Sequence, residues 1–158
     1  MSSPESRAAV MALLPHRDPF LFVDRFERES DESLIAHWHV PKDADWFRGH
    51  YPGQPVLPGV LTCEHGMQAA AILVALLLGG FQSADGVPVV TRLENARFRR
   101  MVAPGDQLIT KVKLIERFGP AWRMEASVRA DGQRVLDLVC VLSASLALAR
   151  AADGGVAP

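Results

Sequence analysis

The chain is short of cysteine, of tyrosine and of net charge. Its 158 residues include two cysteines and one tyrosine, and 17 basic against 18 acidic side chains leave a formal net charge of −1. Such a balance lacks the basic excess that binds nucleic acid, which excludes that class of partner. Cys63 and Cys140 lie far apart and form no disulfide framework, so we expect reduced thiols in a cytoplasmic protein.

Long hydrophobic runs are also scarce. The most apolar segment, residues 67–78, has about half the length of a membrane-spanning helix, so it predicts a buried helix and no membrane partner. Residues 8–14 form a short apolar run after acidic Glu5, without the cleavage pattern of a signal peptide. We therefore expect one domain, residues 1–150, and a flexible tail, residues 151–158, with the small and Gly-rich sequence AADGGVAP.

Alternating β-type segments surround a single apolar helix. Residues 60–78 have almost no polar face and end at Gly79 and Gly80, a pattern that predicts a long buried helix. The expected strands are β-branched-rich runs bounded by turn residues, at 20–26, 33–40, 87–98, 107–118, 121–130 and 133–148. The sequence thus predicts an α+β fold, in which an antiparallel sheet of about six strands wraps round one long helix at about 60–78.

The turns between these strands have clear signatures. Asp131 and Gly132 are typical of a two-residue hairpin turn, and the sequence APGD at 103–106 separates two other strands. Residues 43–58 are rich in Pro, Gly and Asp, and each proline removes a backbone donor, so this segment is predicted to be a loop.

The candidate chemistry lies in residues 49–68, GHYPGQPVLPGVLTCEHGMQ. His50 sits in a part of the loop that three prolines and two glycines restrain, which suits a positioned general base. Glu64 is about one turn into the helix, with Gln68 beside it on the same face.

The first turn of this helix supplies a third group. The backbone amides of Gly59 and Val60 have no partner within the helix, and they can receive the negative charge that develops on a bound carbonyl oxygen. Base, carboxylate and oxyanion donors therefore occur within one short stretch.

Three blocks of the sequence resemble the 3-hydroxyacyl-[acyl-carrier-protein] dehydratases of type II fatty acid synthesis. Residues 49–68 match the motif GHFPG-x-P-x-x-PGV-x-x-x-E-x-x-x-Q, and LPHRDPFLFVDR at 14–25 and ARFRRMVAPGDQL at 96–108 agree in the same order. The resemblance implies a hot-dog fold that works as a homodimer, a trimer of dimers or a heterodimer. It also implies an acyl carrier protein as the partner that carries the substrate.

The resemblance implies that His50 takes the C2 proton of a (3R)-3-hydroxyacyl thioester. Glu64 from the other protomer assists departure of the 3-hydroxyl as water, which leaves a trans-2-enoyl product, and Gln68 orients Glu64. The reaction needs no metal or other cofactor. Residues expected to line the substrate tunnel are Tyr51, Pro52 and Phe98.

The other histidines permit a competing interpretation as a metal site. His37 and His39 share one face of a strand, but no second closely spaced ligand pair accompanies them, so we expect no metal. His16 is expected to be a structural residue, and His65 a packing or interface residue.

A basic cluster, Arg97, Arg99 and Arg100, has two interpretations. It forms either a solvated face or a dock for the acidic helix of an acyl carrier protein, and the resemblance favours docking.

Two other functional classes stay open. One is a thioesterase or a dehydratase–isomerase on the same fold, although aspartate commonly stands at the position of Glu64 in the isomerases. The other is a non-catalytic subunit of a hetero-oligomeric dehydratase, against which the presence of both His50 and Glu64 argues. Departures from the family pattern at Tyr51, residues 43–46 and residues 65–66 leave the acyl chain open among fatty acid, polyene and polyketide intermediates.

Overall fold

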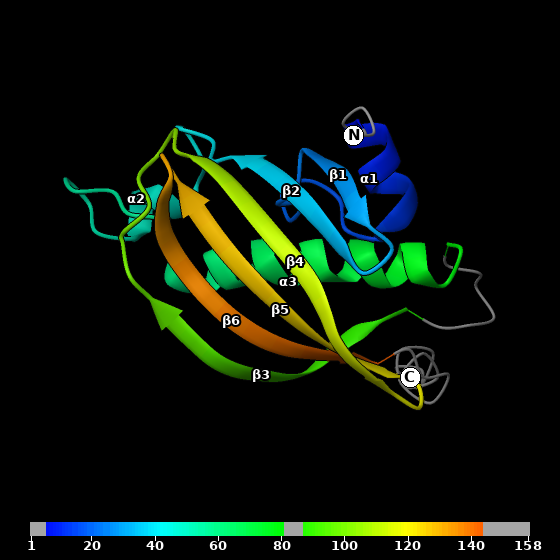
Figure 1. Cartoon of the computed structure of the whole chain (residues 1–158). Helices are drawn as coiled ribbons and strands as arrows, with labels where there is room; N and C mark the ends of the chain where they lie inside the picture. Colours follow the sequence, from blue (N-terminus) through cyan, green and yellow to red (C-terminus); the bar gives the residue numbers. More distant parts are fainter. Residues whose placement is uncertain (1–5, 81–86, 144–158) are drawn as a thin grey trace, which may run out of the picture.

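A single antiparallel sheet curls round a central helix in the computed structural model, which describes residues 6–80 and 87–143 (Figure 1). The strands lie in the order β1-β2-β4-β5-β6-β3. The predicted α+β architecture is confirmed. The helices are α1 (Arg7–Leu13), α2 (Trp46–Gly49) and α3 (Gly59–Leu77), and the strands are β1 (Arg25–Ser30), β2 (Ser33–His39), β3 (Val89–Phe98), β4 (Gln107–Phe118), β5 (Ala121–Ala130) and β6 (Gln133–Ser143).

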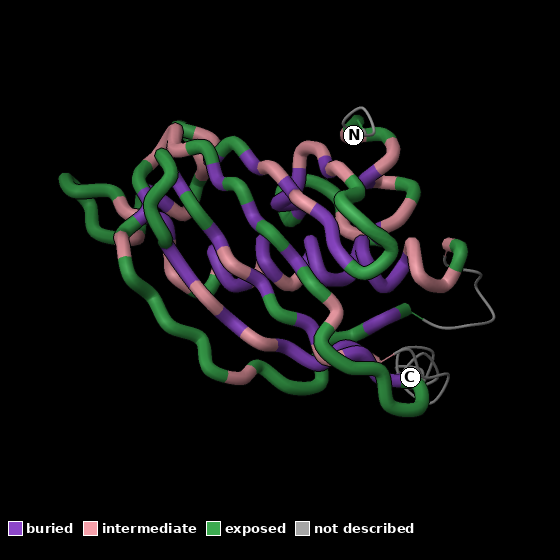
Figure 2. The backbone as a smooth tube through the Cα atoms, viewed as in Figure 1, coloured by how far each residue is buried: buried purple, intermediate pink, exposed green. Residues whose placement is uncertain are grey.

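Helix α3 forms the centre of the core. Buried residues run along it from Thr62 to Ala75, and the buried stretch of the tube lies under the sheet in Figure 2. By length and composition α3 could cross a membrane, yet 67% of its most apolar window is buried inside the protein. A Cβ added to Gly66 would lie 3.4 Å from Leu138 and 3.5 Å from Ala126, so this glycine lets β5 and β6 pack close to the helix.

The two glycines predicted to end the helix do so through a Schellman motif. The Gly80 amide donates to the Ala75 carbonyl (2.8 Å) and the Gly79 amide to the Leu76 carbonyl (3.2 Å). Both glycines have positive φ, 74° and 101°, which a side chain would disfavour.

The predicted turns are also present. Asp131 and Gly132 have φ values of 50° and 73°, as a type I′ hairpin turn requires. In the APGD turn the Asp106 amide donates to the Ala103 carbonyl (3.2 Å), and Gly105 has a φ of 88°, the geometry of a type II turn with proline at its second position.

Several elements differ from the prediction. Strand β1 begins at Arg25, so the segment 20–24 predicted as strand is irregular. Helix α1 was not predicted, and the predicted loop 43–58 contains the short helix α2. Strand β6 ends at Ser143 within the described part, and the rest of its predicted range, with the predicted tail, lies outside the described residues.

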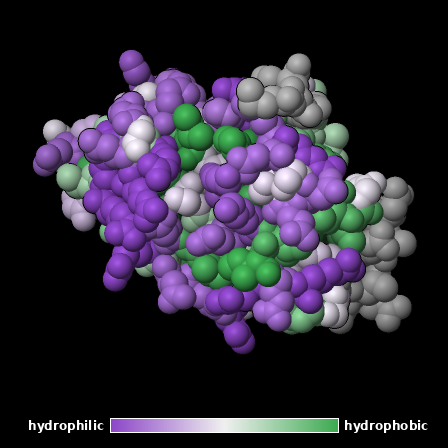
Figure 3. Space-filling view, in the orientation of Figure 1, coloured by the Kyte–Doolittle hydropathy of each residue, from purple (hydrophilic) through white to green (hydrophobic). Residues whose placement is uncertain are grey.

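Strand β3 is an edge strand with an unusual surface. It pairs with β6 on one side only among the described strands, and nine of its ten residues are exposed (Figure 2). Its apolar side chains are exposed too, with Leu93 at 45% and Phe98 at 52%. Hydrophobic side chains gather toward this lower part of the sheet in Figure 3. A long edge with apolar side chains is typical of a strand that another chain covers.

Candidate active site

The His50 ring is held in one orientation at the end of α2. Its backbone amide donates to the Trp46 carbonyl (2.9 Å), and its Nδ1 lies 2.7 Å from the Val56 carbonyl oxygen. Since a carbonyl oxygen can only accept, Nδ1 carries the proton. The Nε2 atom therefore presents a lone pair, as a general base must.

The first turn of α3 lies next to this base. The structure begins the helix at Gly59, and the amides of Gly59 and Val60 make no backbone hydrogen bond in the described ranges. A Cβ on Gly59 would lie 2.9 Å from Cε1 of Phe98, a distance that real Cβ atoms do not tolerate. Glycine is thus the residue that lets the Phe98 ring cover the helix N-terminus.

A cavity of about 480 Å³ brings several predicted site residues together. His50, Tyr51, Gly59 and Phe98 line it. Of the residues predicted for the oxyanion site and the tunnel, two lie outside its lining: Val60, which is 72% exposed, and Pro52.

Glu64 faces a different cavity, of about 450 Å³. Its polar lining is His16, Glu64 and Gln68, and its remaining lining is apolar, including Met67 and Leu93. Within one chain, the base and the carboxyl group therefore do not share a cavity.

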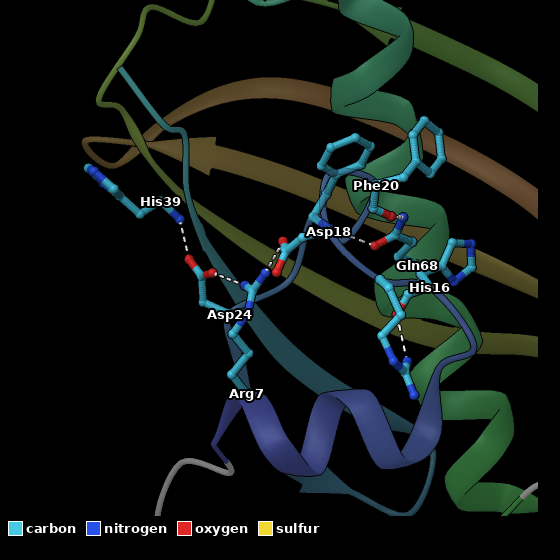
Figure 4. A network of polar contacts seen from close by, with 9 residues as sticks. Arg7, His16, Asp18, Phe20, Asp24, His39 and Gln68 are labelled. Carbon is cyan, nitrogen blue, oxygen red and sulfur yellow. Dashed lines mark hydrogen bonds and ion pairs between the residues drawn. The ribbon is translucent and has the colours of Figure 1, made fainter. Parts of the chain in front are cut away.

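Gln68 fixes Glu64 to the loop that precedes β1, and most of its contacts are drawn in Figure 4. The buried amide accepts from the Phe22 N–H through Oε1 (2.8 Å) and donates through Nε2 to the Phe20 carbonyl (3.1 Å) and to Glu64 Oε1 (3.0 Å). The hydrogen bond from Gln68 to Glu64 is present as expected. The Phe20 and Phe22 backbone groups are engaged with the helix, which explains why this segment is not a strand.

An ion-pair network fastens the same loop to the N-terminal helix. Arg7 bridges Asp24 (2.7 Å) and Asp18, and Asp24 accepts from the His39 amide (2.7 Å), as Figure 4 shows. These side chains are partly exposed, so their ion pairs add little to the free energy of folding. Their main effect is to fix the position of the loop against α1.

Two of the remaining histidines have structural partners. His65 is fully buried, with Nδ1 2.7 Å from the Phe22 carbonyl and Nε2 2.7 Å from the Thr110 hydroxyl. Burial lowers the pKa of His65 to about 4. His37 contacts Glu27 (3.1 Å), and no cluster of three metal-ligating side chains occurs in the residues described.

The basic cluster is largely neutralised. Arg99 pairs with Asp137 (2.7 Å), and Arg100 pairs with Asp131 (3.3 Å) and Asp106. The Arg97 side chain has no ion pair with any described residue and is exposed.

Comparisons with known proteins show the family. The family model of the FabA-like domain matches residues 14–138. The 3-hydroxyacyl-[acyl-carrier-protein] dehydratase FabZ of Anaeromyxobacter dehalogenans (strain 2CP-1) is 41% identical over 129 residues, 81% of this chain and 83% of the relative. FabZ of Coxiella burnetii (strain RSA 331) is 40% identical over 121 residues, 76% of this chain and 85% of the relative.

A solved structure supports the fold. The dehydratase heterocomplex ApeI:P from Xenorhabdus doucetiae superposes with a TM-score of 0.74 at 15% identity, over 92% of this chain and 97% of that one. This likeness shows the hot-dog fold expected from the sequence. With a family model that spans most of its length and relatives near 40% identity, the chain belongs to the FabA-like family.

Proposed function

We propose that this protein is a hydro-lyase that removes water from (3R)-3-hydroxyacyl chains on an acyl carrier protein, giving trans-2-enoyl chains. Relatives named 3-hydroxyacyl-[acyl-carrier-protein] dehydratase cover most of its length at about 40% identity. The observation that carries the proposal is the cavity that His50, with its free Nε2, shares with Gly59 at the start of α3.

In the proposed reaction His50 Nε2 removes the C2 proton. The electrons of that C–H bond form the C2–C3 double bond, while charge builds on the thioester oxygen. The Gly59 amide at the positive end of α3 stabilises this oxygen. A hydrogen-bond donor lowers the activation barrier most when it faces the atom on which charge develops. Phe98 covers the helix end and excludes water from it.

Glu64 completes the elimination. The C3–O bond breaks, and the leaving hydroxyl takes the proton of the Glu64 carboxyl group and departs as water. The proton on His50 then returns to Glu64, so that the net reaction is loss of one water molecule. Gln68 holds Oε1 of Glu64 throughout.

The separate cavities of His50 and Glu64 lead us to propose that each active site uses two protomers. A second copy that pairs along the exposed edge of β3 would cover its apolar side chains and bring the partner's loop toward Glu64. This arrangement applies to a homodimer, to a trimer of dimers and to a heterodimer alike.

Arg97 is the candidate contact for the carrier protein. Among the three arginines proposed for docking, it alone keeps a charge that no described acidic residue neutralises. We therefore assign docking chiefly to Arg97 and a structural role to Arg99 and Arg100.

The test is incubation of the purified protein with a panel of 3-hydroxyacyl carrier proteins, with enoyl formation as the readout. We expect turnover that falls at least about 100-fold in His50→Ala and in Glu64→Gln, because each removes a proton-transfer group. Release of free thiol instead of enoyl product would identify a thioesterase. Unchanged turnover in both variants would refute the assigned site.

A further inference from the structure

We propose that His16 is a positioning residue for Glu64, an inference that rests on the proposed dehydratase function. His16 Nε2 lies 3.6 Å from Glu64 Oε1. Both residues line the same cavity, beside Gln68. The side chain thus faces the acid group of the proposed reaction, and it has a role beyond the structural one that the sequence predicts.

The hydrogen bonding of His16 differs from that of the structural histidine in this protein. Both ring nitrogens of His65 have partners, whereas Nδ1 of His16 is buried and has no hydrogen-bond partner among the described residues. A buried histidine kept for packing is normally satisfied. The ring of His16 is therefore directed by its other nitrogen, the one that faces Glu64.

The orphaned nitrogen also defines the tautomer. Oε1 of Glu64 accepts from Gln68 and is the oxygen without the acid proton, so the nitrogen of His16 that faces it carries a proton. A second proton, on the buried Nδ1, would lack an acceptor among the described residues. The geometry thus favours the Nε2–H tautomer of His16, with this N–H directed at Glu64.

This donor gives the two oxygens of Glu64 different roles. Gln68 Nε2 (3.0 Å) and His16 Nε2 (3.6 Å) both approach Oε1. The other oxygen, Oε2, is left to give its proton to the leaving hydroxyl, and Oε1 is stabilised as the carboxylate charge develops. The 3.6 Å separation exceeds hydrogen-bond length, and we expect it to shorten when substrate and the partner protomer complete the site.

The loop that carries His16 is built to hold this ring. The His16 ring stacks on Phe20 with centroids 6.4 Å apart and planes inclined by 23°. The Phe20 carbonyl also accepts from Gln68, so a single short segment places both donors to Glu64. The Arg7 network anchors that segment at Asp18.

The test compares His16→Phe, which keeps a stacking ring without a donor, with His16→Gln, which keeps an N–H near the position of Nε2. We expect kcat of the Phe variant to fall roughly 10- to 30-fold with KM within about twofold, because one donor to developing charge is lost. The Gln variant should recover most of this loss. Both should retain the melting temperature and the oligomeric state of the wild type.

Wild-type turnover in the Phe variant, or a Gln variant as slow as the Phe variant, would overturn the inference while leaving the dehydratase function intact. A wild-type protein that forms no enoyl product would overturn both. Ring-¹⁵N spectra of the wild type give a measurement that does not depend on how the variants fold. They should show the Nε2–H tautomer for His16, and an Nδ1–H tautomer would contradict the proposal.

Discussion

Histidines in this protein acquire different roles from the partners of their two ring nitrogens. His65 has a backbone carbonyl on one side and a hydroxyl on the other, so it is a neutral core residue with partners for both ring nitrogens. His50 has one nitrogen bound to a carbonyl and one free, and His16 has one nitrogen buried and one facing a carboxyl group. Residue type alone shows none of these differences, because the partners come from distant parts of the chain.

Titration of His65 should make folding stability depend on pH. Its folded pKa of about 4 lies below the ordinary value of 6.5, so the unfolded chain binds more protons between these values. Stability is thus fully present above pH 6.5 and is lost as the pH falls toward 4, by about 1.4 kcal/mol per pH unit. Urea unfolding at pH 6.5 and pH 5 should show a loss of roughly 2 kcal/mol from this group.

His65→Gln provides the control for this prediction. It removes the titrating group and leaves the other histidines to titrate equally in both proteins. The variant should be less stable at pH 6.5 and should have a shallower pH dependence. Identical slopes in the two proteins would show that burial of His65 does not cause the effect.

Residues of the site were predictable where they are close in sequence. His50, Glu64 and Gln68 fall in one motif, and helical spacing alone places the last two on one face. His16 could not be found in this way. Its contact with Glu64 exists because the loop before β1 folds against α3, a tertiary event without a local sequence signal.

At the scale of elements, the residues that end helices and form turns gave most of the correct predictions. Gly79 and Gly80 end α3, and Asp131 and Gly132 turn the chain between β5 and β6, because few other residues accept these φ values. The segment 20–24 misled the prediction. Its apolar residues resemble a strand, but Phe22 gives its amide to a glutamine side chain instead of a neighbouring strand.

Gly105→Ala should test the APGD turn, which lies between β3 and β4, most directly. Its φ of 88° is unfavourable for alanine, so we expect a loss of about 1–2 kcal/mol in the free energy of unfolding. The added Cβ would also meet Cε of Lys42 at 2.7 Å, although this flexible side chain can move. Chemical denaturation measures the change.

Gly49→Ala is the matched control for that substitution. Gly49 has no atom within 4 Å of an added Cβ and no positive φ. Its replacement should change the unfolding free energy by less than about 0.5 kcal/mol. Equal losses in the two variants would mean that backbone conformation is not the cause.

At the scale of the whole molecule, a site shared between protomers allows complementation. Mixing inactive His50→Ala with inactive Glu64→Gln, followed by unfolding and refolding together, should form mixed dimers with one intact site each. With random pairing, about a quarter of wild-type activity should return, because half of the dimers are mixed and each has one working site of two. Activity assay of the refolded mixture is the measurement.

Refolding each variant alone is the control, and neither should regain activity. A mixture that stays inactive, while wild-type protein refolded in the same way is active, would place both catalytic groups in one protomer. It would also remove the reason for pairing two copies along β3.

The burial of α3 has a consequence for the order in which the protein is made. This helix is long and apolar enough to cross a membrane, and it packs against β4, β5 and β6, which all follow it in the chain. A nascent chain that has left the ribosome only as far as β3 therefore exposes the helix without most of its cover. We expect such chains to need a chaperone during synthesis, because translation of β4, β5 and β6 is what buries the apolar helix and ends its exposure to aggregation.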